Sequence, residues 1–341
     1  MRVIILAALA CLIGSSAFAA DYSWFGGYSW TQKTQQYGKQ FGMYDIDARR
    51  VFRFNLRKGR RDRNTDVYYA NQYTAPWQTR DVKKNWGHGW KGQNVDVAII
   101  DNFSYRYLNG RTHGDMVQTV LHGGVSNNRY VSGVAPASRL TQFERPGDML
   151  YGRDFDVINY SWDYRHHNAD SIRAAEHVAY RSATTGAISV IAAGNSGLNC
   201  QNAYSCSNLG VAHTGNMVNG EYVRDPYNLA IVAGAEDYAS SNRAGILKKD
   251  FVVTSGRGPV VGWQETNGTS FAAPRVAGTA ALIMSKFPRM NKMGVKKLIL
   301  ETADGMGSCA GLSKRWSCSD ETYGHGRLNV GAALSPFGKL R

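Results

Sequence analysis

Four short apolar runs in the middle of the chain have the pattern of strands that are buried on both faces. They occupy residues 95–100, 157–160, 188–193 and 229–233. Near-continuous runs of this length are typical of parallel strands covered by helices. Between and after them, apolar residues recur at helical spacing around 172–179, 280–283 and 295–299. The alternation predicts an α/β fold of three layers, with a mostly parallel central sheet and helices on both faces.

The first 19 residues have the pattern of a signal peptide. Arg2 provides the positive start, residues 3–13 are apolar, and Ala17-Phe18-Ala19 has the small-x-small form of a cleavage site. The apolar stretch is shorter than the ~20 residues of a membrane-spanning helix, and no later segment approaches that length. We therefore expect an exported protein, in the periplasm or the medium, with no stable membrane insertion.

The cysteines fit an exported protein with disulfides. Of five cysteines, Cys11 lies in the predicted signal peptide, which leaves four in the mature chain. Four cysteines allow three pairings, and we expect the two short loops, Cys200 with Cys206 and Cys309 with Cys318. The spacings differ from those of a zinc ribbon, so no metal site is predicted.

The chain is basic, with 40 Lys and Arg against 26 Asp and Glu, a net charge of +14. Such a charge favours anionic partners but says little about fold or reaction. A basic stretch at 49–63, interleaved with Phe52 and Phe54, suits contact with a polyanion. We prefer a solvated pro-segment as the explanation of the same residues.

Polar residues that could carry chemistry follow the apolar runs. Asp101 comes directly after the first run, and Asn195 follows the third. Residues at the carboxyl ends of parallel strands form the binding sites of open α/β sheets. His113 and Ser270 each stand where a helical run begins. These residues could supply a carboxylate, a base, a hydroxyl nucleophile and an amide donor for an oxyanion.

The order Asp, His, Ser and the surrounding motifs resemble the subtilisin-like serine proteases, or subtilases. Residues 268–274 (Gly-Thr-Ser-Phe-Ala-Ala-Pro) are similar to the family's nucleophile segment. Further similar segments lie at 97–101, 113–117, 133–136, 157–161, 191–197 and 323–330. The resemblance covers roughly 75–335 and implies a subtilisin-like fold with Asp101, His113 and Ser270 as triad and Asn195 as oxyanion donor. It implies a monomeric serine endopeptidase that acts on polypeptides.

By the same resemblance, the chain divides into a signal peptide at 1–19, a pro-region or N-terminal extension at 20–74, and a peptidase domain at 75–341. The match of residues 20–74 to a pro-region is one of position only. Lys58-Gly59-Arg60-Arg61 offers a candidate processing site.

Two departures from the family pattern bear on cofactors and specificity. Only 12 positions (113 − 101) separate Asp101 from His113, whereas most subtilases have a longer stretch with an extra strand and often calcium ligands. We therefore predict no required cofactor and leave calcium dependence open. Ser161, Trp162 and Asp163 replace the usual Ser-Leu-Gly of the substrate-binding edge, to which Gly194 also belongs. Trp162 is expected to reshape an apolar subsite, and Asp163 to favour a basic side chain. The natural substrate does not follow from the sequence.

Three alternatives remain. His122 is also followed by glycine and competes with His113 for the base, but it lacks the valine four residues on. An α/β-hydrolase would use Ser270, Asp304 or Asp320, and His325, yet the serine segment is not the Gly-x-Ser-x-Gly of that fold. Finally, the fold could serve as a catalytically inactive, basic binding module.

Overall fold

The computed structural model describes residues 74–108, 110–144, 154–164, 166–305 and 320–335. The predicted signal peptide, the 49–63 stretch and the predicted Cys309–Cys318 pair lie outside the described residues. In the described part, no helix combines the length and apolar character needed to cross a membrane.

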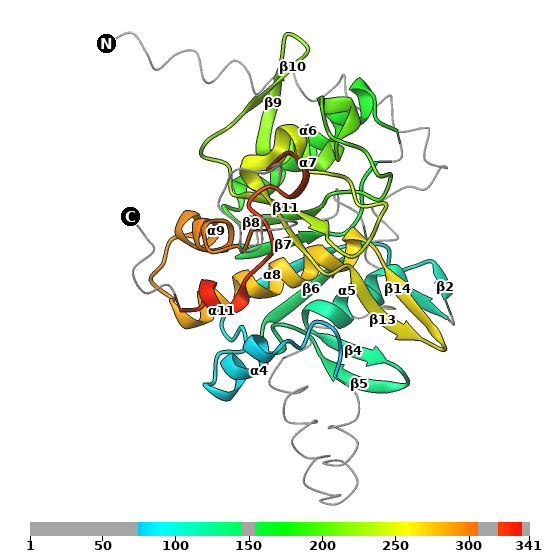
Figure 1. Cartoon of the computed structure of the whole chain (residues 1–341), viewed down its shortest axis with the longest axis vertical. Coiled ribbons are helices and arrows are strands. Elements are labelled where there is room, and N and C mark those ends of the chain that lie inside the picture. The colour runs from blue at the N-terminus through cyan, green and yellow to red at the C-terminus, as the bar shows by residue number, and fades with distance from the viewer. Residues whose placement is uncertain (1–73, 109, 145–153, 165, 306–319, 336–341) are drawn as a thin grey trace, which may run out of the picture. The chain divides into compact units, whose positions relative to one another are not determined.

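The core of the domain is a six-stranded parallel sheet with the strand order β12-β11-β8-β7-β1-β6 (Figure 1). Its strands are β1 (Asp96–Ile100), β6 (Arg139–Phe143), β7 (Val157–Tyr160), β8 (Ile188–Ala192), β11 (Ala230–Ala235) and β12 (Phe251–Thr254). The four predicted runs are the four central strands, so the α/β prediction is confirmed. The edge strands β6 and β12 were not predicted; β6 is largely polar and has a single buried residue, Leu140.

Helices cover both faces of the sheet, as predicted. They are α4 (Arg80–Gly87), α5 (His113–Leu121), α6 (Ala169–Thr184), α7 (Asn208–Thr214), α8 (Thr269–Lys286), α9 (Lys292–Glu301), α10 (Asp320–Tyr323) and α11 (Val330–Ala333), with 3-10 turns η2 (Ala203–Ser205) and η3 (Gly245–Asp250). Alternate residues of β1 point to opposite faces. Val97 and Ile99 join the core cluster of α5 and α8, whereas Ala98 and Ile100 join that of α6 and α7.

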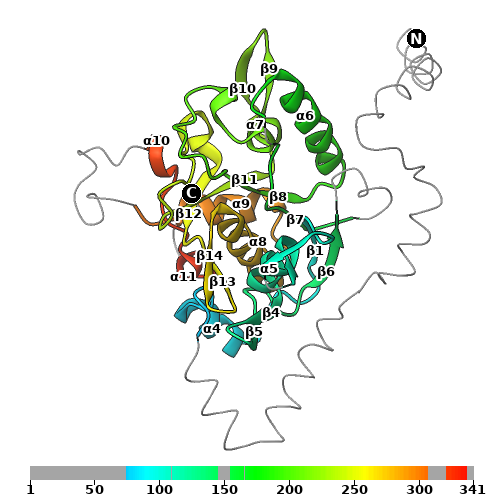
Figure 2. The same cartoon turned by 90° about the vertical axis from the view of Figure 1, so that its right-hand side faces the viewer.

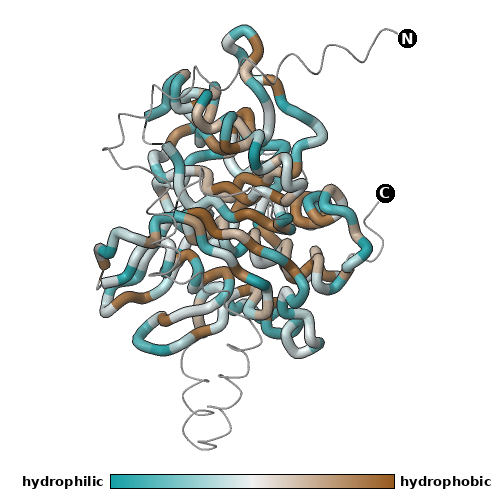
Figure 3. Tube along the Cα trace, turned by 180° about the vertical axis from the view of Figure 1, so that it is seen from behind, coloured by the Kyte–Doolittle hydropathy of each residue, from teal (hydrophilic) through white to brown (hydrophobic). Residues whose placement is uncertain are grey.

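Helix α8 is the central helix of the domain (Figure 2). Every residue from Thr269 to Ile283 is buried, because the helix packs on strands β7, β8, β11 and β12 and on helices α5 and α9. A helix that is apolar on all sides is typical of a protein core. The hydropathy of the trace agrees, since hydrophobic segments concentrate at the centre of the domain (Figure 3).

Among the described residues, four two-stranded antiparallel hairpins surround the main sheet. They are β2 (Arg106–Leu108) with β3 (Arg111–Thr112), β4 (Gly123–Ser126) with β5 (Arg129–Ser132), β9 (Gly215–Val218) with β10 (Glu221–Arg224), and β13 (Arg257–Val261) with β14 (Gln264–Asn267). The β2–β3 hairpin fills the shortened stretch between Asp101 and His113. That stretch therefore contains two very short strands.

A buried charge cluster links three elements that are distant from one another in the sequence: β10, η3 and α9. The Asp250 carboxylate, fully buried, accepts two bonds from the Arg224 guanidinium, at 2.6 and 2.7 Å, and one from Lys296 Nζ at 2.5 Å. Lys296 Nζ also donates to the backbone oxygen and the side-chain oxygen of Asn228, at 2.9 and 2.7 Å. Each charge in this cluster is therefore paired with an opposite charge.

Candidate active site

Asp101 and His113 form a direct pair. Asp101 follows β1 and is 2% exposed, and its Oδ1 lies 2.6 Å from His113 Nδ1. The same oxygen accepts the Asn102 N–H at 2.6 Å, whereas Oδ2 is buried without a hydrogen-bond partner among the described residues. Burial raises the pKa of the Asp101 carboxyl, and the nearby His113 opposes that rise.

Local sequence explains the position of His113. It is the first residue of α5, and Thr112 is the N-cap. Thr112 Oγ1 accepts the Asp115 N–H at 3.0 Å, and Asp115 Oδ2 accepts the Thr112 N–H at 3.1 Å. This reciprocal capping box fixes the direction in which the chain enters the helix. The imidazole is therefore held beside Asp101 by a helix start that is itself anchored.

Ser270 is the second residue of α8, after the N-cap Gly268. Gly268 has a φ of 149°, in the region that favours glycine, and a Cβ there would come within 3.3 Å of Asn195 Nδ2. The first N–H groups of a helix have no helical partner and lie at the positive end of its dipole. The nucleophile candidate is thus placed where backbone donors are available to an anion.

The Ser270 hydroxyl hydrogen-bonds within the protein in this structure. Ser270 Oγ donates to the Ser161 backbone oxygen at 3.0 Å, and Ser161 Oγ donates back to the Ser270 backbone oxygen at 2.9 Å. Asn159 Nδ2 supports Ser161 Oγ from below at 2.9 Å. The next residue, Phe271, has its ring centroid 5.9 Å from that of His113, so the start of α8 lies near the imidazole. The Ser270 hydroxyl is nevertheless hydrogen-bonded to Ser161 and not to His113.

Asn195 presents its amide nitrogen to the site. Asn195 is exposed near the start of the loop after β8, and its Oδ1 accepts the Thr269 N–H at 2.9 Å and the Thr269 hydroxyl at 3.0 Å. Because a backbone N–H can only donate, the oxygen must face Thr269. The Nδ2 group is thereby left on the side of Gly268 and Ser270, free to donate to an anion.

Asn242, which the sequence analysis did not single out, holds the loop that carries Asn195. Its Oδ1 accepts the N–H groups of Ser196 and Leu198 at 3.1 and 3.0 Å, and its Nδ2 donates to the Ala193 backbone oxygen at 2.9 Å. Gly194 lies between them with a φ of 98°, and a Cβ there would meet Asn242 Nδ2 at 2.5 Å. A polar run after β11 was the available sequence signal for this residue.

A pocket of about 190 Å³ opens beside these groups. It is bounded by all four predicted substrate-binding residues and by residues of the predicted catalytic set. The lining comprises Ser161, Trp162, Asp163, Tyr164, His167, Ala192, Gly194, Asn195, Ser196, Asn242, Thr269 and Ser270. The rings of Trp162 and Tyr164 pack edge to face at 5.2 Å and form an aromatic wall. Tyr164 and His167 were not predicted, and motif spacing gives no signal for them.

Asp163 lies in this pocket, but its carboxylate is used by the protein. Its oxygens accept the N–H groups of Asn208 at 2.9 Å, Leu209 at 3.2 Å and Tyr164 at 2.9 Å. Burial raises the pKa of this carboxyl, while these donors lower it. Asp163 thus binds the first residues of α7, and these contacts give no support to the predicted preference for a basic side chain.

The Cys200–Cys206 disulfide, one of the two predicted pairs, is present and closes a loop next to the pocket. His167 Nδ1 donates to the Cys206 backbone oxygen at 2.8 Å, which joins the pocket wall to this loop. Cys200 in turn follows the segment that carries Asn195. The disulfide therefore connects the wall of the pocket with the loop of the amide donor.

The competing residues form contacts elsewhere. His122 ends α5 and is buried, and burial lowers its pKa to about 4. His325 Nε2 hydrogen-bonds the Lys249 backbone oxygen at 3.1 Å, and the Asp304 carboxylate accepts Asn329 Nδ2. In the described part of the chain, neither His122 nor the residues of the α/β-hydrolase alternative form an Asp–His pair like that of Asp101 and His113. The described residues also contain no group of three or more His, Cys, Asp or Glu that could hold a metal ion.

Comparison with known proteins gives a family. The model of the subtilase family matches residues 96–326. Subtilisin from Bacillus pumilus is 28% identical over 290 residues, which cover 72% of this chain and 92% of that protein. Subtilisin E from Bacillus subtilis (strain 168) is 26% identical over 313 residues, 78% of this chain and 73% of that protein.

Solved structures show the same fold. The structure of the prenylagaramide maturation protease PagA superposes with a TM-score of 0.54 at 18% identity, covering 75% of this chain and 98% of that chain. The protease domain of PatA, solved as a serine-to-alanine mutant, gives a TM-score of 0.50 at 22% identity, covering 72% of this chain and 96% of that chain. The subtilisin-like fold that the sequence implied is confirmed.

Proposed function

Because the chain belongs to the subtilase family, we propose that it is an exported serine endopeptidase that hydrolyses polypeptides through an acyl-enzyme. The observation that carries the proposal is the arrangement around Ser270. On one side is the Asp101–His113 pair, in which Asp101 Oδ1 and His113 Nδ1 are 2.6 Å apart. On the other side is the amide of Asn195, which Thr269 orients.

The proposed reaction assigns one role to each group. The Ser270 hydroxyl turns from the Ser161 oxygen to His113, which takes its proton at Nε2 as the Ser270 oxygen attacks the scissile carbonyl. Asp101 holds Nδ1–H and stabilises the charged imidazole. Asn195 Nδ2 and the Ser270 N–H bind the oxyanion. His113 then gives its proton to the leaving amine, and water repeats the sequence to release the acyl group.

The resting hydrogen bond between Ser270 and Ser161 is compatible with this reaction. Catalytic hydrogen bonds are often absent or poorly aligned before substrate binds and form in the complex. A rotation about the Ser270 Cα–Cβ bond moves the hydroxyl without a change in α8. The pocket of about 190 Å³ beside it would hold the side chain on the acyl side of the scissile bond.

The test is secretion of the wild type and Ser270→Ala side by side, with intact mass and casein cleavage measured for each. We expect the wild type to cleave casein and Ser270→Ala to be inactive with an unchanged melting temperature. Loss of residues 1–19 from both proteins would support the export signal. A wild-type protein whose N-terminus lies between residues 60 and 75, together with a longer Ser270→Ala protein, would support 20–74 as a pro-region removed by self-processing.

Two outcomes would contradict the proposal. Equal cleavage by both proteins would remove Ser270 from the chemistry. A mature wild type that cleaves nothing, with or without calcium, would favour the inactive binding module. N-terminal sequencing of active enzyme that begins at Ala20 or Asp21 would reject removal of the pro-region alone.

A further inference from the structure

Trp263 is 99% exposed, the highest value among the large hydrophobic residues that the structure describes. It occupies the tip of the β13–β14 hairpin, where Val261 pairs with Gln264 and leaves a two-residue turn. Gly262, with a φ of 63°, takes the first position of that turn, which suits glycine. The turn therefore places an indole ring in solvent, where burial of its apolar surface by a partner would be favourable.

The hairpin under Trp263 is held in shape before any partner binds. Thr266 Oγ1 donates to the Pro259 backbone oxygen at 2.8 Å, within the hairpin. The neighbouring β4–β5 hairpin is joined to it through Asn127, whose N–H donates to the Val260 backbone oxygen at 2.8 Å. Ser126 Oγ accepts the Val260 N–H at 2.9 Å. A hairpin whose backbone is already ordered loses little conformational entropy when its tip binds, and Trp is enriched among energetically important interface residues.

The base of the hairpin touches the candidate active site on the His113 side. A Cβ on Gly258 of β13 would lie 2.7 Å from the Phe271 ring, and that ring is 5.9 Å from the imidazole. Since His113 protonates the leaving amine, the substrate beyond the scissile bond lies on this side. Trp263 is five residues along the strand from Gly258 (263 − 258), or ~16 Å at the rise of a β-strand. An extended substrate would reach it about five residues after the scissile bond.

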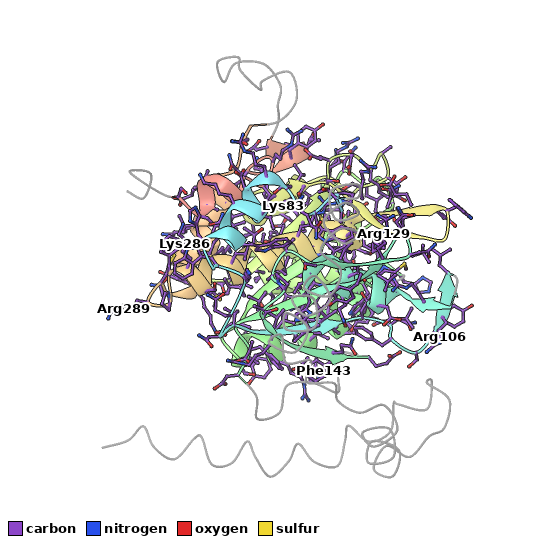
Figure 4. The ribbon with its side chains drawn as sticks, turned by 90° about the horizontal axis from the view of Figure 1, so that it is seen from below. Lys83, Arg106, Arg129, Phe143, Lys286 and Arg289 are labelled. Carbon is purple, nitrogen blue, oxygen red and sulfur yellow. A yellow bond between two sulfur atoms is a disulfide. The ribbon has the colours of Figure 1, made fainter. Side chains whose placement is uncertain are left out.

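Basic side chains stand beside this hairpin. Arg129 is exposed and pairs in register with Ser126, the residue bonded to Val260. Arg106 on β2 is exposed at the same side of the domain, and Lys286 and Arg289 lie at the opposite side (Figure 4). The guanidinium of Arg111 joins the β2–β3 hairpin to the backbone oxygen of Val125 on β4. Because the one carboxylate of the hairpin, Glu265, is paired with Arg257, the cations around the indole favour a segment that carries negative charge.

We propose that the β13–β14 hairpin is an exosite for the substrate on its leaving-group side. Trp263 packs on an apolar side chain about five residues after the scissile bond, and Arg129 attracts an acidic neighbour of that side chain. This inference rests on the proposed endopeptidase activity and adds a preference downstream of the cleaved bond.

The test compares one substrate at two lengths. A peptide that wild type cleaves within casein is made ending two or eight residues after the scissile bond, with a leucine and an aspartate near position five of the longer form. Trp263→Ser is compared with Tyr227→Ser, which removes another exposed aromatic (83% exposed) far from this hairpin in sequence. We expect Trp263→Ser to raise KM about tenfold for the long peptide only, with kcat unchanged, while Tyr227→Ser changes neither. Arg129→Gln should raise KM severalfold, and less so when the aspartate is replaced by asparagine.

Equal KM values for wild type and Trp263→Ser on the long peptide would overturn the exosite alone. A change on both peptides would mean that Trp263 acts through the active-site geometry, which also overturns it. A wild-type dimer or anionic-vesicle binding that Trp263→Ser abolishes, with KM unchanged, would assign the surface to another occupant. No cleavage by wild type would instead overturn the proposed function, and the exosite with it.

Discussion

Asp101 and Asp250 are both buried carboxylates, but the protein surrounds them differently. Asp250 is met by two cations, Arg224 and Lys296, whose bonds reach both of its oxygens. Asp101 is met by one partly exposed imidazole, and one of its oxygens has no hydrogen-bond partner among the described residues. Removing one partner from a compensated buried charge destabilises the fold, whereas an under-compensated charge beside a titratable group is typical of a catalytic site. The two sites should therefore respond in opposite ways to mutation.

The largest effect is expected from Asp101→Asn. An amide at this position cannot stabilise the imidazolium and favours the wrong tautomer of His113, so turnover should fall by roughly 10⁴-fold. The melting temperature should stay equal or rise, because burial already disfavours the Asp101 charge. Casein cleavage and thermal unfolding measure the two quantities. Turnover within tenfold of wild type would place the catalytic carboxylate elsewhere.

Lys296→Met should show the reverse behaviour. It leaves the buried Asp250 carboxylate with Arg224 alone, and breaking a buried ion pair costs about 3–5 kcal/mol of unfolding free energy. Turnover below the unfolding temperature should remain that of wild type. Lys297→Met is the matched control, since the neighbouring side chain is exposed. Equal urea midpoints for the two variants would mean that the cluster contributes nothing to stability.

Asn195→Ala tests whether the Asp101–His113 pair acts together with an oxyanion donor. Loss of one side-chain donor should lower kcat by about 100- to 1000-fold and leave KM and the melting temperature little changed. Asn199→Ala, another exposed asparagine of the same loop, serves as the control. Wild-type turnover in Asn195→Ala would reject the role assigned to this amide.

The smallest effect concerns two buried histidines that lie outside the proposed reaction. Burial lowers the pKa of both His122 and His213 to about 4, below the usual 6.5. The unfolded chain therefore binds more protons between these values, and stability should fall as the pH drops from about 6.5 towards 4, by on the order of 3 kcal/mol for each histidine. His213→Gln should reduce the pH dependence of the urea midpoint over this interval. An unchanged slope would show that folding does not lower the pKa of His213.

The fold could be predicted from the sequence where burial dominates the local pattern. Four central strands are continuous apolar runs because both of their faces are covered by helices, and the structure has them where expected. The edge strands β6 and β12 and the four hairpins escaped prediction. The hairpin strands and β6 show no sustained periodicity, and the apolar run of β12 covers only residues 251–253. Their partners are fixed by tertiary contacts such as that between Asn127 and Val260.

The candidate site was predictable in its residues but not in its hydrogen bonds. The positions of Asp101 and Asn195 follow from strand ends, and those of His113 and Ser270 from helix starts. The direction of the Asp163 carboxylate depends on α7, which begins 45 residues later (208 − 163). The bonds of Asn242 to the Asn195 loop likewise join segments that only the folded sheet brings together. Sequence patterns indicate burial and local geometry. They do not indicate hydrogen bonds between segments that are distant in the sequence.

The three proposed triad members are widely separated along the chain, and the sequence separation of Asp101 and Ser270 is 169 (270 − 101). Contacts over such distances form late, because loop closure must precede them. Helix α8 adds to this dependence, since its first residues are buried only when the sheet is complete. A chain that crosses a membrane unfolded, as the predicted signal peptide requires, would thus carry no hydrolytic activity on the way out. The producing cell would be protected by the order of folding, before any pro-region needs to act.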